Sequence, residues 1–171
     1  MIHKGMIKVP YAANRSLAYS YDYYMHEGIF RRKLYFPEKT GKEKWLSNVD
    51  NTIIQNWDLL PKSGGDVLFI TSSKKDCGPF YRIYNKWNAC APNNEGSFLP
   101  EDVFFKKIKP RWNRIILWFD NDDTGIKNSL KWAKKYQIEA VWNPVNAPKD
   151  QSDFVKAHGL REFNNLIQKL T

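Results

Sequence analysis

The chain has 171 residues, of which 42% are apolar, and its 27 Lys and Arg outnumber its 18 Asp and Glu, giving a net charge of +9. This length and composition support one domain with a real core, or a core domain with a smaller one attached. No apolar run approaches the roughly 20 residues of a membrane span and no signal-peptide pattern is present, so we expect a cytoplasmic protein without a membrane partner.

The basic charge is combined with many aromatic residues: seven Trp, nine Tyr and ten Phe. Phosphates complement the charge and bases stack on the rings, so this composition favours a nucleic-acid partner. A basic globular protein with no polyanionic partner is the alternative. The two cysteines cannot by themselves form a four-ligand zinc site, and the three histidines lack ligand spacing.

In the first part of the chain, residues 1–13 carry little signal. Aromatic alternation predicts strands over 17–25 and 29–36, joined by a turn at 26–28 as a β-hairpin, and a third strand over 44–49. Residues 50–61 are ambiguous, with a short helix as one interpretation.

One face of the predicted hairpin carries Arg31, Lys33 and Tyr35. This face is either a contact for single-stranded nucleic acid or an ordinary solvated surface. The pattern-breaking segment 62–65 marks the expected domain boundary, so we predict an N-terminal β-rich subdomain over 1–61 and an α/β domain over 62–171.

Beyond the boundary, short apolar runs alternate with helical patterns, which indicates a parallel sheet flanked by helices. The predicted strands are 66–71, 87–92, 114–119 and 138–142. The predicted helices are 77–84, 100–109, 126–136, 152–158 and 163–170.

The most informative stretch is the apolar strand ending at Phe119, which is followed at once by Asp120, Asn121, Asp122 and Asp123. Ligands gather at the carboxyl ends of strands in open α/β sheets. Two carboxylates two residues apart can share one Mg²⁺ or Mn²⁺, which keeps positions for substrate phosphates. The alternative is a structural turn, because Asp and Asn are common in turns and helix caps.

The loops after all four strands open on the same edge of the predicted sheet. That arrangement brings together residues 72–76, 93–96, 120–123 and 149–153. Their convergence favours a functional site over four unrelated turns.

Three segments resemble the signature segments of the Toprim domain, which is shared by bacterial-type DNA primases, topoisomerases, some nucleases and recombination proteins. They are Thr-Ser-Ser-Lys-Lys-Asp at 71–76, Phe-Asp-Asn-Asp-Asp-Thr-Gly at 119–125 and Lys-Asp-Gln-Ser-Asp at 149–153. Within the family, the chain is most similar to phage primase–helicase proteins. The resemblance implies a four-stranded parallel sheet and Mg²⁺ on Asp120 and Asp122. It also marks supporting positions at Asp76, Gly125, Asp150 and Asp153.

The sequence departs from this family at one important position. The glutamate that the family carries after its first strand aligns with Ser72 and Ser73, whose hydroxyls can cap a helix or bind phosphate but cannot act as a carboxylate. Glu95 ends the neighbouring strand, and we expect it to supply the third carboxylate beside Asp120 and Asp122, as metal ligand and general base. The alternative is that Glu95 is a solvated loop residue.

The resulting hypothesis is a Mg²⁺-dependent nucleotidyl-transferase core of a phage DNA primase. Lys75, Lys149 and Arg114 would neutralise phosphate charge, and the hairpin subdomain would carry the template. The expected partners are single-stranded DNA or RNA–DNA, nucleoside triphosphates, and a replicative helicase or zinc-ribbon module in another chain or a missing segment. A phage-encoded protein would work in the host cytoplasm. A Toprim nuclease and a non-catalytic nucleic-acid-binding module remain alternatives.

Overall fold

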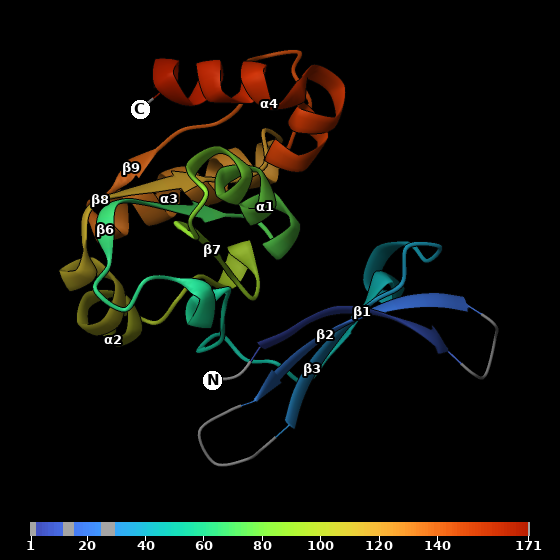
Figure 1. The fold of residues 1–171 in the computed structure, drawn as a ribbon. Coiled ribbons are helices and arrows are strands. Elements are labelled where there is room, and N and C mark those ends of the chain that lie inside the picture. The colour runs from blue at the N-terminus through green and yellow to red at the C-terminus, as the bar shows by residue number, and fades with distance from the viewer. Residues whose placement is uncertain (1–2, 12–15, 25–29, 171) are drawn as a thin grey trace. The chain divides into compact units, whose positions relative to one another are not determined.

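A computed structural model describes residues 3–11, 16–24 and 30–170 (Figure 1). The chain divides into two compact units, Met1–Asp50 and Asn51–Thr171, which are described separately below.

The first unit contains an antiparallel sheet in the order β1-β2-β3-β4. Its strands are β1 (His3–Tyr11), β2 (Ser16–Tyr24), β3 (Phe30–Tyr35) and β4 (Trp45–Ser47). The pairing of β2 with β3 confirms the predicted hairpin, and β4 confirms the third strand. The predicted turn at 26–28 lies outside the described residues. Strand β1 was not predicted, because Gly5 and Pro10 interrupt its short apolar alternation.

The second unit is built on a five-stranded sheet in the order β5-β7-β6-β8-β9. Its strands are β5 (Ile54–Gln55), β6 (Gly65–Thr71), β7 (Ala89–Pro92), β8 (Trp112–Trp118) and β9 (Glu139–Ala140). Strands β7, β6, β8 and β9 run parallel, which confirms the predicted α/β class.

The ambiguous segment 50–61 contains strand β5, which was not predicted, and only one short 3-10 helix. Strand β5 pairs antiparallel with β7 and is followed by this single 3-10 turn, Trp57–Leu59. Ile53 and Ile54 are buried, so this segment closes one edge of the core of the second unit.

The helices of the second unit are α1 (Lys74–Tyr84), α2 (Glu101–Val103), α3 (Asp123–Tyr136) and α4 (Gln151–Leu170). The predicted helix over 100–109 is irregular, because α2 continues as a π-helical turn over Phe104–Ile108 and a 3-10 turn over Lys109–Arg111. Gly159 interrupts α4 with a φ of 84°, which confirms that a helix ends there before the terminal helix begins.

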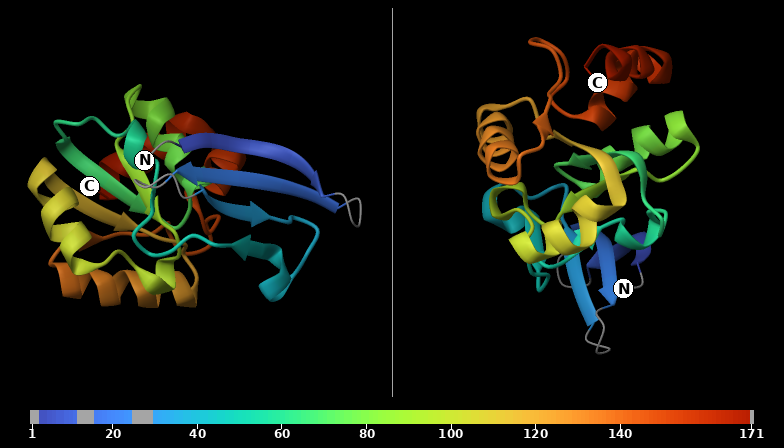
Figure 2. Two further views of the ribbon diagram at one scale, coloured as in Figure 1. Left: turned by 90° about the horizontal axis from the view of Figure 1, so that it is seen from below. Right: turned by 90° about the vertical axis from the view of Figure 1, so that its left-hand side faces the viewer.

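Both faces of the central sheet are covered by helices (Figure 2). Leu68, Ile70 and Leu117 pack on one face with Val103, Phe104, Trp132 and Tyr136 from the α2 segment and α3. Phe69, Ile116 and Trp118 pack on the opposite face with Phe80 of α1 and Phe163 of α4. Burial on both faces explains why β6 and β8 appear in the sequence as continuous apolar runs. It also leaves the carboxyl edge of the strands as the place for polar chemistry.

No helix within residues 3–11, 16–24 and 30–170 is both long and apolar enough to cross a membrane.

Candidate metal and phosphate site

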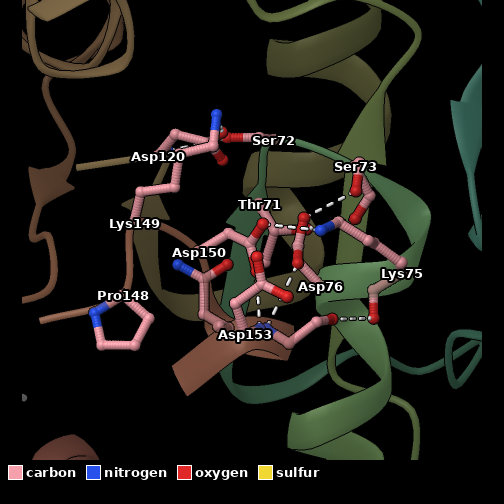
Figure 3. Close-up of polar contacts among 12 residues, drawn as sticks. Thr71, Ser72, Ser73, Lys75, Asp76, Asp120, Pro148, Lys149, Asp150 and Asp153 are labelled. Carbon is pink, nitrogen blue, oxygen red and sulfur yellow. Dashed lines mark hydrogen bonds and ion pairs between the residues drawn. The ribbon is translucent and has the colours of Figure 1, made fainter. Parts of the chain in front are cut away.

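Three aspartates converge at the carboxyl edge of the parallel sheet. Asp76 lies in the first turns of α1 after β6, Asp120 follows β8, and Asp150 lies immediately before α4 (Figure 3). One carboxylate oxygen from each lies within 4.8 Å of the others. Strands β6 and β8 are neighbours in the sheet, so the loops that follow them are brought side by side. An all-carboxylate group at this spacing offers the hard oxygen ligands that Mg²⁺ and Mn²⁺ prefer.

Asp76 is the most buried member, with 1% of its surface exposed. Its carboxylate accepts hydrogen bonds from Ser73 Oγ at 2.6 Å and from the Ser152 backbone N–H at 3.3 Å. Burial, reinforced by the nearby charge of Asp150, raises the pKa of Asp76 to about 7. A bound cation would favour the ionised form, because it would replace repulsion between carboxylates with attraction.

Asp150 is held in its ionised form by a lysine. Burial alone would raise its pKa, but the Lys75 ammonium, 2.6 Å from Asp150 Oδ2, and the other hydrogen bonds to the carboxylate together outweigh burial and lower it. The backbone N–H of Asp153 also donates to Asp150 Oδ1 at 2.7 Å. Asp153 therefore supports the cluster through its backbone, while Asp153 itself is exposed.

Asp120 and Asp122 are bridged by Lys149, whose Nζ lies 2.9 Å from Asp120 Oδ2 and 3.3 Å from Asp122 Oδ2. Asp122 is the N-cap of α3 and accepts a hydrogen bond from the Gly125 N–H at 2.9 Å. That hydrogen bond is the main reason that the pKa of Asp122 is lowered. The three-aspartate cluster found among the described residues includes Asp120 but neither Asp122 nor Glu95. The assignment of these two as metal ligands stays a prediction.

Glu95 lies beside the position where the Toprim resemblance places a glutamate. Ser72 Oγ donates a hydrogen bond to Glu95 Oε2 at 3.2 Å and accepts one from the Asp120 N–H at 2.8 Å. Partial burial raises the pKa of Glu95, and the charge of Asp120 adds to this effect. The Trp132 indole N–H donates to the Glu95 carbonyl at 2.8 Å, which fixes the loop that carries the glutamate. These hydrogen bonds hold the Glu95 side chain near the loop that carries Asp120.

The serine hydroxyls at 72 and 73 both contact carboxylates, and their predicted role in binding phosphate stays a prediction. Ser72 donates to Glu95, and Ser73 donates to Asp76. Ser73 occupies the N-cap position of α1, yet its side chain accepts no capping hydrogen bond there.

Gly125 allows the aspartate turn to fold tightly against α3. A Cβ at this position would lie 2.2 Å from the Asp120 carbonyl oxygen, so no other residue fits without a shift of backbone. The glycine in the Asp-x-Asp-x-x-Gly segment is thus explained by the close approach of two backbone segments.

Of the three predicted phosphate-binding cations, the structure brings two to the cluster. Lys75 and Lys149 contact it directly, and about half of each side chain remains exposed. Arg114 lies toward the amino end of β8 and pairs with Glu139, with Nε 2.6 Å from Oε1. It is therefore away from the carboxyl edge where the aspartates meet.

The predicted face of Arg31, Lys33 and Tyr35 belongs to the first unit. Lys33 Nζ lies 4.4 Å from the centroid of the Trp45 ring, and the Tyr35 and Trp45 ring centroids are 4.6 Å apart. Burial lowers the pKa of Lys33 to about 8. Arg31 donates to the Asn48 carbonyl at 3.1 Å. Trp45 stays 40% exposed, so the face combines partly buried cations with an accessible ring.

Asp76 and Asp150 were expected only as supporting residues, although the structure puts both in the cluster. The available signal was their position, because each follows a strand and stands at the start of a helix. Their mutual distance could not be read from the sequence, in which they are separated by most of the second unit.

Comparison with solved structures shows that the chain has a fold like that of a phage primase catalytic core. The first similar structure is the primase fragment of the bacteriophage T7 primase-helicase protein, with a TM-score of 0.69 and 16% identity over 95% of this chain. The chain spans 66% of the length of that fragment, slightly under two thirds.

A second similar chain comes from the structure of bacteriophage T7 lagging-strand DNA polymerase interacting with primase domains of two gp4 subunits bound to an RNA/DNA hybrid and dTTP. Its TM-score is 0.66 and its identity 14%, covering 96% of this chain and 80% of that one. No protein-family model and no curated protein sequence matches the chain. At such identities the likeness establishes the fold.

Proposed function

We propose that this chain is the nucleotidyl-transferase core of a phage-type DNA primase of the Toprim kind. The observation that carries the proposal is the convergence of Asp76, Asp120 and Asp150 at the carboxyl edge of the parallel sheet in this fold. Phosphoryl-transfer sites use such carboxylates to position metal-bound phosphates.

The three aspartates fit a divalent cation, because their donor set is entirely carboxylate oxygen and Asp76 is buried among like charges. Asp76, Asp120 and Asp150 would hold Mg²⁺ or Mn²⁺. Asp122 would lie beside them, because Lys149 forms ion pairs with both Asp120 and Asp122. When bound, the ion would neutralise the charge that develops on the substrate phosphates.

Lys75 and Lys149 would bind the triphosphate of the incoming nucleotide. Each ammonium already contacts a carboxylate of the cluster and keeps about half of its side chain exposed. A phosphate oxygen can therefore reach either lysine without displacing buried groups. Preorganised cations of this kind stabilise charge without reorganising during the reaction.

Glu95 would act on the attacking hydroxyl. In nucleotidyl transfer, a 3′-oxygen bonds to the α-phosphorus of the nucleotide, the α–β phosphoanhydride bond breaks, and pyrophosphate leaves. The 3′-hydroxyl proton goes to Glu95, whose raised pKa makes it a better proton acceptor than an ordinary surface glutamate. Ser72 holds the carboxylate in place through its hydroxyl.

The proposed partners follow from this reaction: single-stranded DNA, the RNA–DNA product and nucleoside triphosphates. On the Lys33–Trp45 face, the Trp45 ring would stack on a base of the template strand and Lys33 would neutralise a phosphate. A replicative helicase or zinc-ribbon module would complete the replication protein, which would work in the host cytoplasm if phage-encoded.

The test is primer synthesis on single-stranded DNA with labelled ribonucleotides and Mg²⁺ or Mn²⁺. The expected result is short labelled products from the wild type and none from Asp120→Asn. A matched control is Asp66→Asn, which alters an exposed aspartate at the amino end of β6. Metal-dependent shortening of labelled DNA without synthesis would support the nuclease alternative. Binding without either reaction would support a non-catalytic module.

A further inference from the structure

Helix α3 carries a row of lysines along its outer surface. Lys127, Lys131 and Lys134 are exposed and follow one another at i, i+4 and i+7, so they lie on one face of the helix. Lys135 lies beside this row. Between Thr124 and Gln137 the sequence contains these four lysines and no Asp or Glu.

This arrangement is unfavourable for an isolated helix. Lysines at i and i+4 repel each other, and α3 contains two such pairs, Lys127 with Lys131 and Lys131 with Lys135. A surface that intersperses both signs favours solubility, and a large field of one sign suits the steering of an oppositely charged partner. Within the described part of the chain, Lys127 and Lys134 make no ion pair, whereas Lys135 pairs with Glu101 at 2.8 Å.

The basic surface continues onto the irregular segment after α2. The Phe105 and Tyr136 ring centroids are 5.7 Å apart, which joins this segment to the end of α3. Lys109 Nζ lies 5.6 Å from the Phe105 ring centroid, and Lys135 Nζ lies 5.5 Å from that of Tyr136. Both elements cover the same face of the sheet (Figure 2). Five cations and no acidic residue occur between Val103 and Ile116.

Two side chains of the same surface are apolar and exposed. Phe105 is 44% exposed and Leu130, which lies between Lys127 and Lys131 in the sequence, is 55% exposed. Cations with interspersed apolar and aromatic groups suit a strand that presents phosphates and the faces of its bases or sugars.

The lysine row begins next to the candidate site. Helix α3 starts at the N-cap Asp122, and its 14 residues extend about 20 Å from there. Trp132 connects the row to the site, because its indole N–H holds the Glu95 carbonyl while Lys131 Nζ lies 4.1 Å from its ring centroid.

We propose that Lys127, Lys131, Lys134, Lys135 and Lys109, here called the α3 lysine surface, bind the sugar–phosphate backbone of the nucleic-acid strand that extends from the active site. The position of the binding surface is inferred from these residues alone. Whether the bound strand is the template or the product depends on the proposed function.

The experiment compares two triple variants of equal charge. Lys127→Gln/Lys131→Gln/Lys134→Gln alters the α3 lysine surface, and Lys62→Gln/Lys156→Gln/Lys169→Gln alters three exposed lysines elsewhere in the second unit. Affinity for a fluorescent single-stranded oligodeoxynucleotide is measured by anisotropy over a range of salt without divalent metal. Thermal denaturation checks that both variants are folded.

Three lost phosphate contacts should make the slope of log affinity against log salt shallower by roughly 2, since each contact contributes about 0.7 on a single strand. The affinity at low salt should fall by at least about tenfold, and the control should bind like the wild type. Equal slopes for the wild type and the α3 variant would overturn the proposal, as would an equal loss in the control.

Two further outcomes separate this proposal from others. If the α3 variant loses binding to phosphatidylserine vesicles but keeps wild-type DNA binding, the surface contacts membranes and the proposal is wrong. If the wild type makes no primer while the α3 variant still loses DNA binding, the surface stands and the proposed function fails. If the wild type makes primer while the α3 variant binds DNA normally, the proposed function stands and the surface is wrong.

Discussion

The Ser72 hydroxyl donates to Glu95 Oε2 at 3.2 Å, which joins the loops after two adjacent parallel strands, β6 and β7. Ser72 stands where the Toprim resemblance places a glutamate. A carboxylate thus lies next to this position, carried by the loop after the neighbouring strand, and Ser72 is its hydrogen-bond partner. The same hydroxyl accepts the Asp120 N–H, so one side chain links the glutamate to the aspartate turn.

Glu95→Gln is expected to reduce primer synthesis by about 10²- to 10⁴-fold, the range for loss of a general acid or base. Glutamine keeps the size and can still accept from Ser72, but it cannot take a proton. Ser72→Ala should lower activity only mildly, because the carboxylate remains. The measurement is the initial rate of labelled primer formation at saturating nucleotide.

The exchange variant Ser72→Glu/Glu95→Ser provides a further control for that prediction. It restores a carboxylate on the loop after β6 and should recover part of the activity lost in Glu95→Gln. Full activity in Glu95→Gln would show that Glu95 moves no proton in the reaction.

Metal affinity should depend most strongly on the three clustered aspartates. Asp120→Asn and Asp150→Asn are each expected to weaken Mn²⁺ binding by at least about tenfold in calorimetry, because each removes one of three converging carboxylates. Asp122→Asn should have a smaller effect, since Asn also caps helices well and Asp122 mainly serves α3. A larger loss for Asp122→Asn than for Asp150→Asn would place the ion between Asp120 and Asp122 instead.

Asp76 should make the metal-free protein less stable as the pH rises. Its folded-state pKa of about 7 lies above the value of about 3.9 for an unfolded chain. Between these values the native state keeps a proton that the unfolded state has lost, so the free energy of unfolding falls as the pH increases, by at most about 1.4 kcal/mol per pH unit.

Asp76→Asn removes this titration and leaves the other groups in place. In urea unfolding in a chelating buffer, the free energy of unfolding of the variant should therefore rise relative to that of the wild type from pH 5 to pH 7. A constant difference in stability across this range would mean that Asp76 titrates normally in the folded protein.

Gly125→Ala should destabilise the protein by about 1–3 kcal/mol, the usual range for overpacking. The added methyl group would lie 2.2 Å from the Asp120 carbonyl oxygen and would push the aspartate turn away from α3. Weaker Mn²⁺ binding should accompany the loss of stability.

Gly78→Ala is the matched control, because it lies in α1 and its added Cβ would have no neighbour within 4 Å. It should stabilise the protein by about 0.4–1 kcal/mol through helix propensity and chain entropy. Equal effects of the two substitutions in denaturant unfolding would contradict the close contact at Gly125.

The order of strands and helices in the second unit could be read largely from the sequence. Strands β6 and β8 are buried on both faces, so their apolar residues are continuous in the sequence and mark the strands directly. The aspartate turn after Phe119 was also visible, because an abrupt change from apolar to acidic residues at a strand end is a local pattern.

Local sequence patterns do not predict strand β5 or the π-helical turn after α2. Strand β5 consists of two residues and pairs with β7, so it has too little periodicity to predict. In the π-helical turn over Phe104–Ile108, Phe104 packs against Phe98 and Tyr136, which come from other segments and are not visible as neighbours in the sequence.

The grouping of Asp76 with Asp120 and Asp150 emerged only from the folded chain. Their loops follow different parallel strands, and the sheet order that joins those loops is fixed by packing between residues far apart in the chain. The pKa values follow the same logic. Burial next to another carboxylate raises the pKa of Asp76, whereas Lys75 beside Asp150 helps to lower the pKa of that residue, and nothing in the sequence around either aspartate indicates this difference.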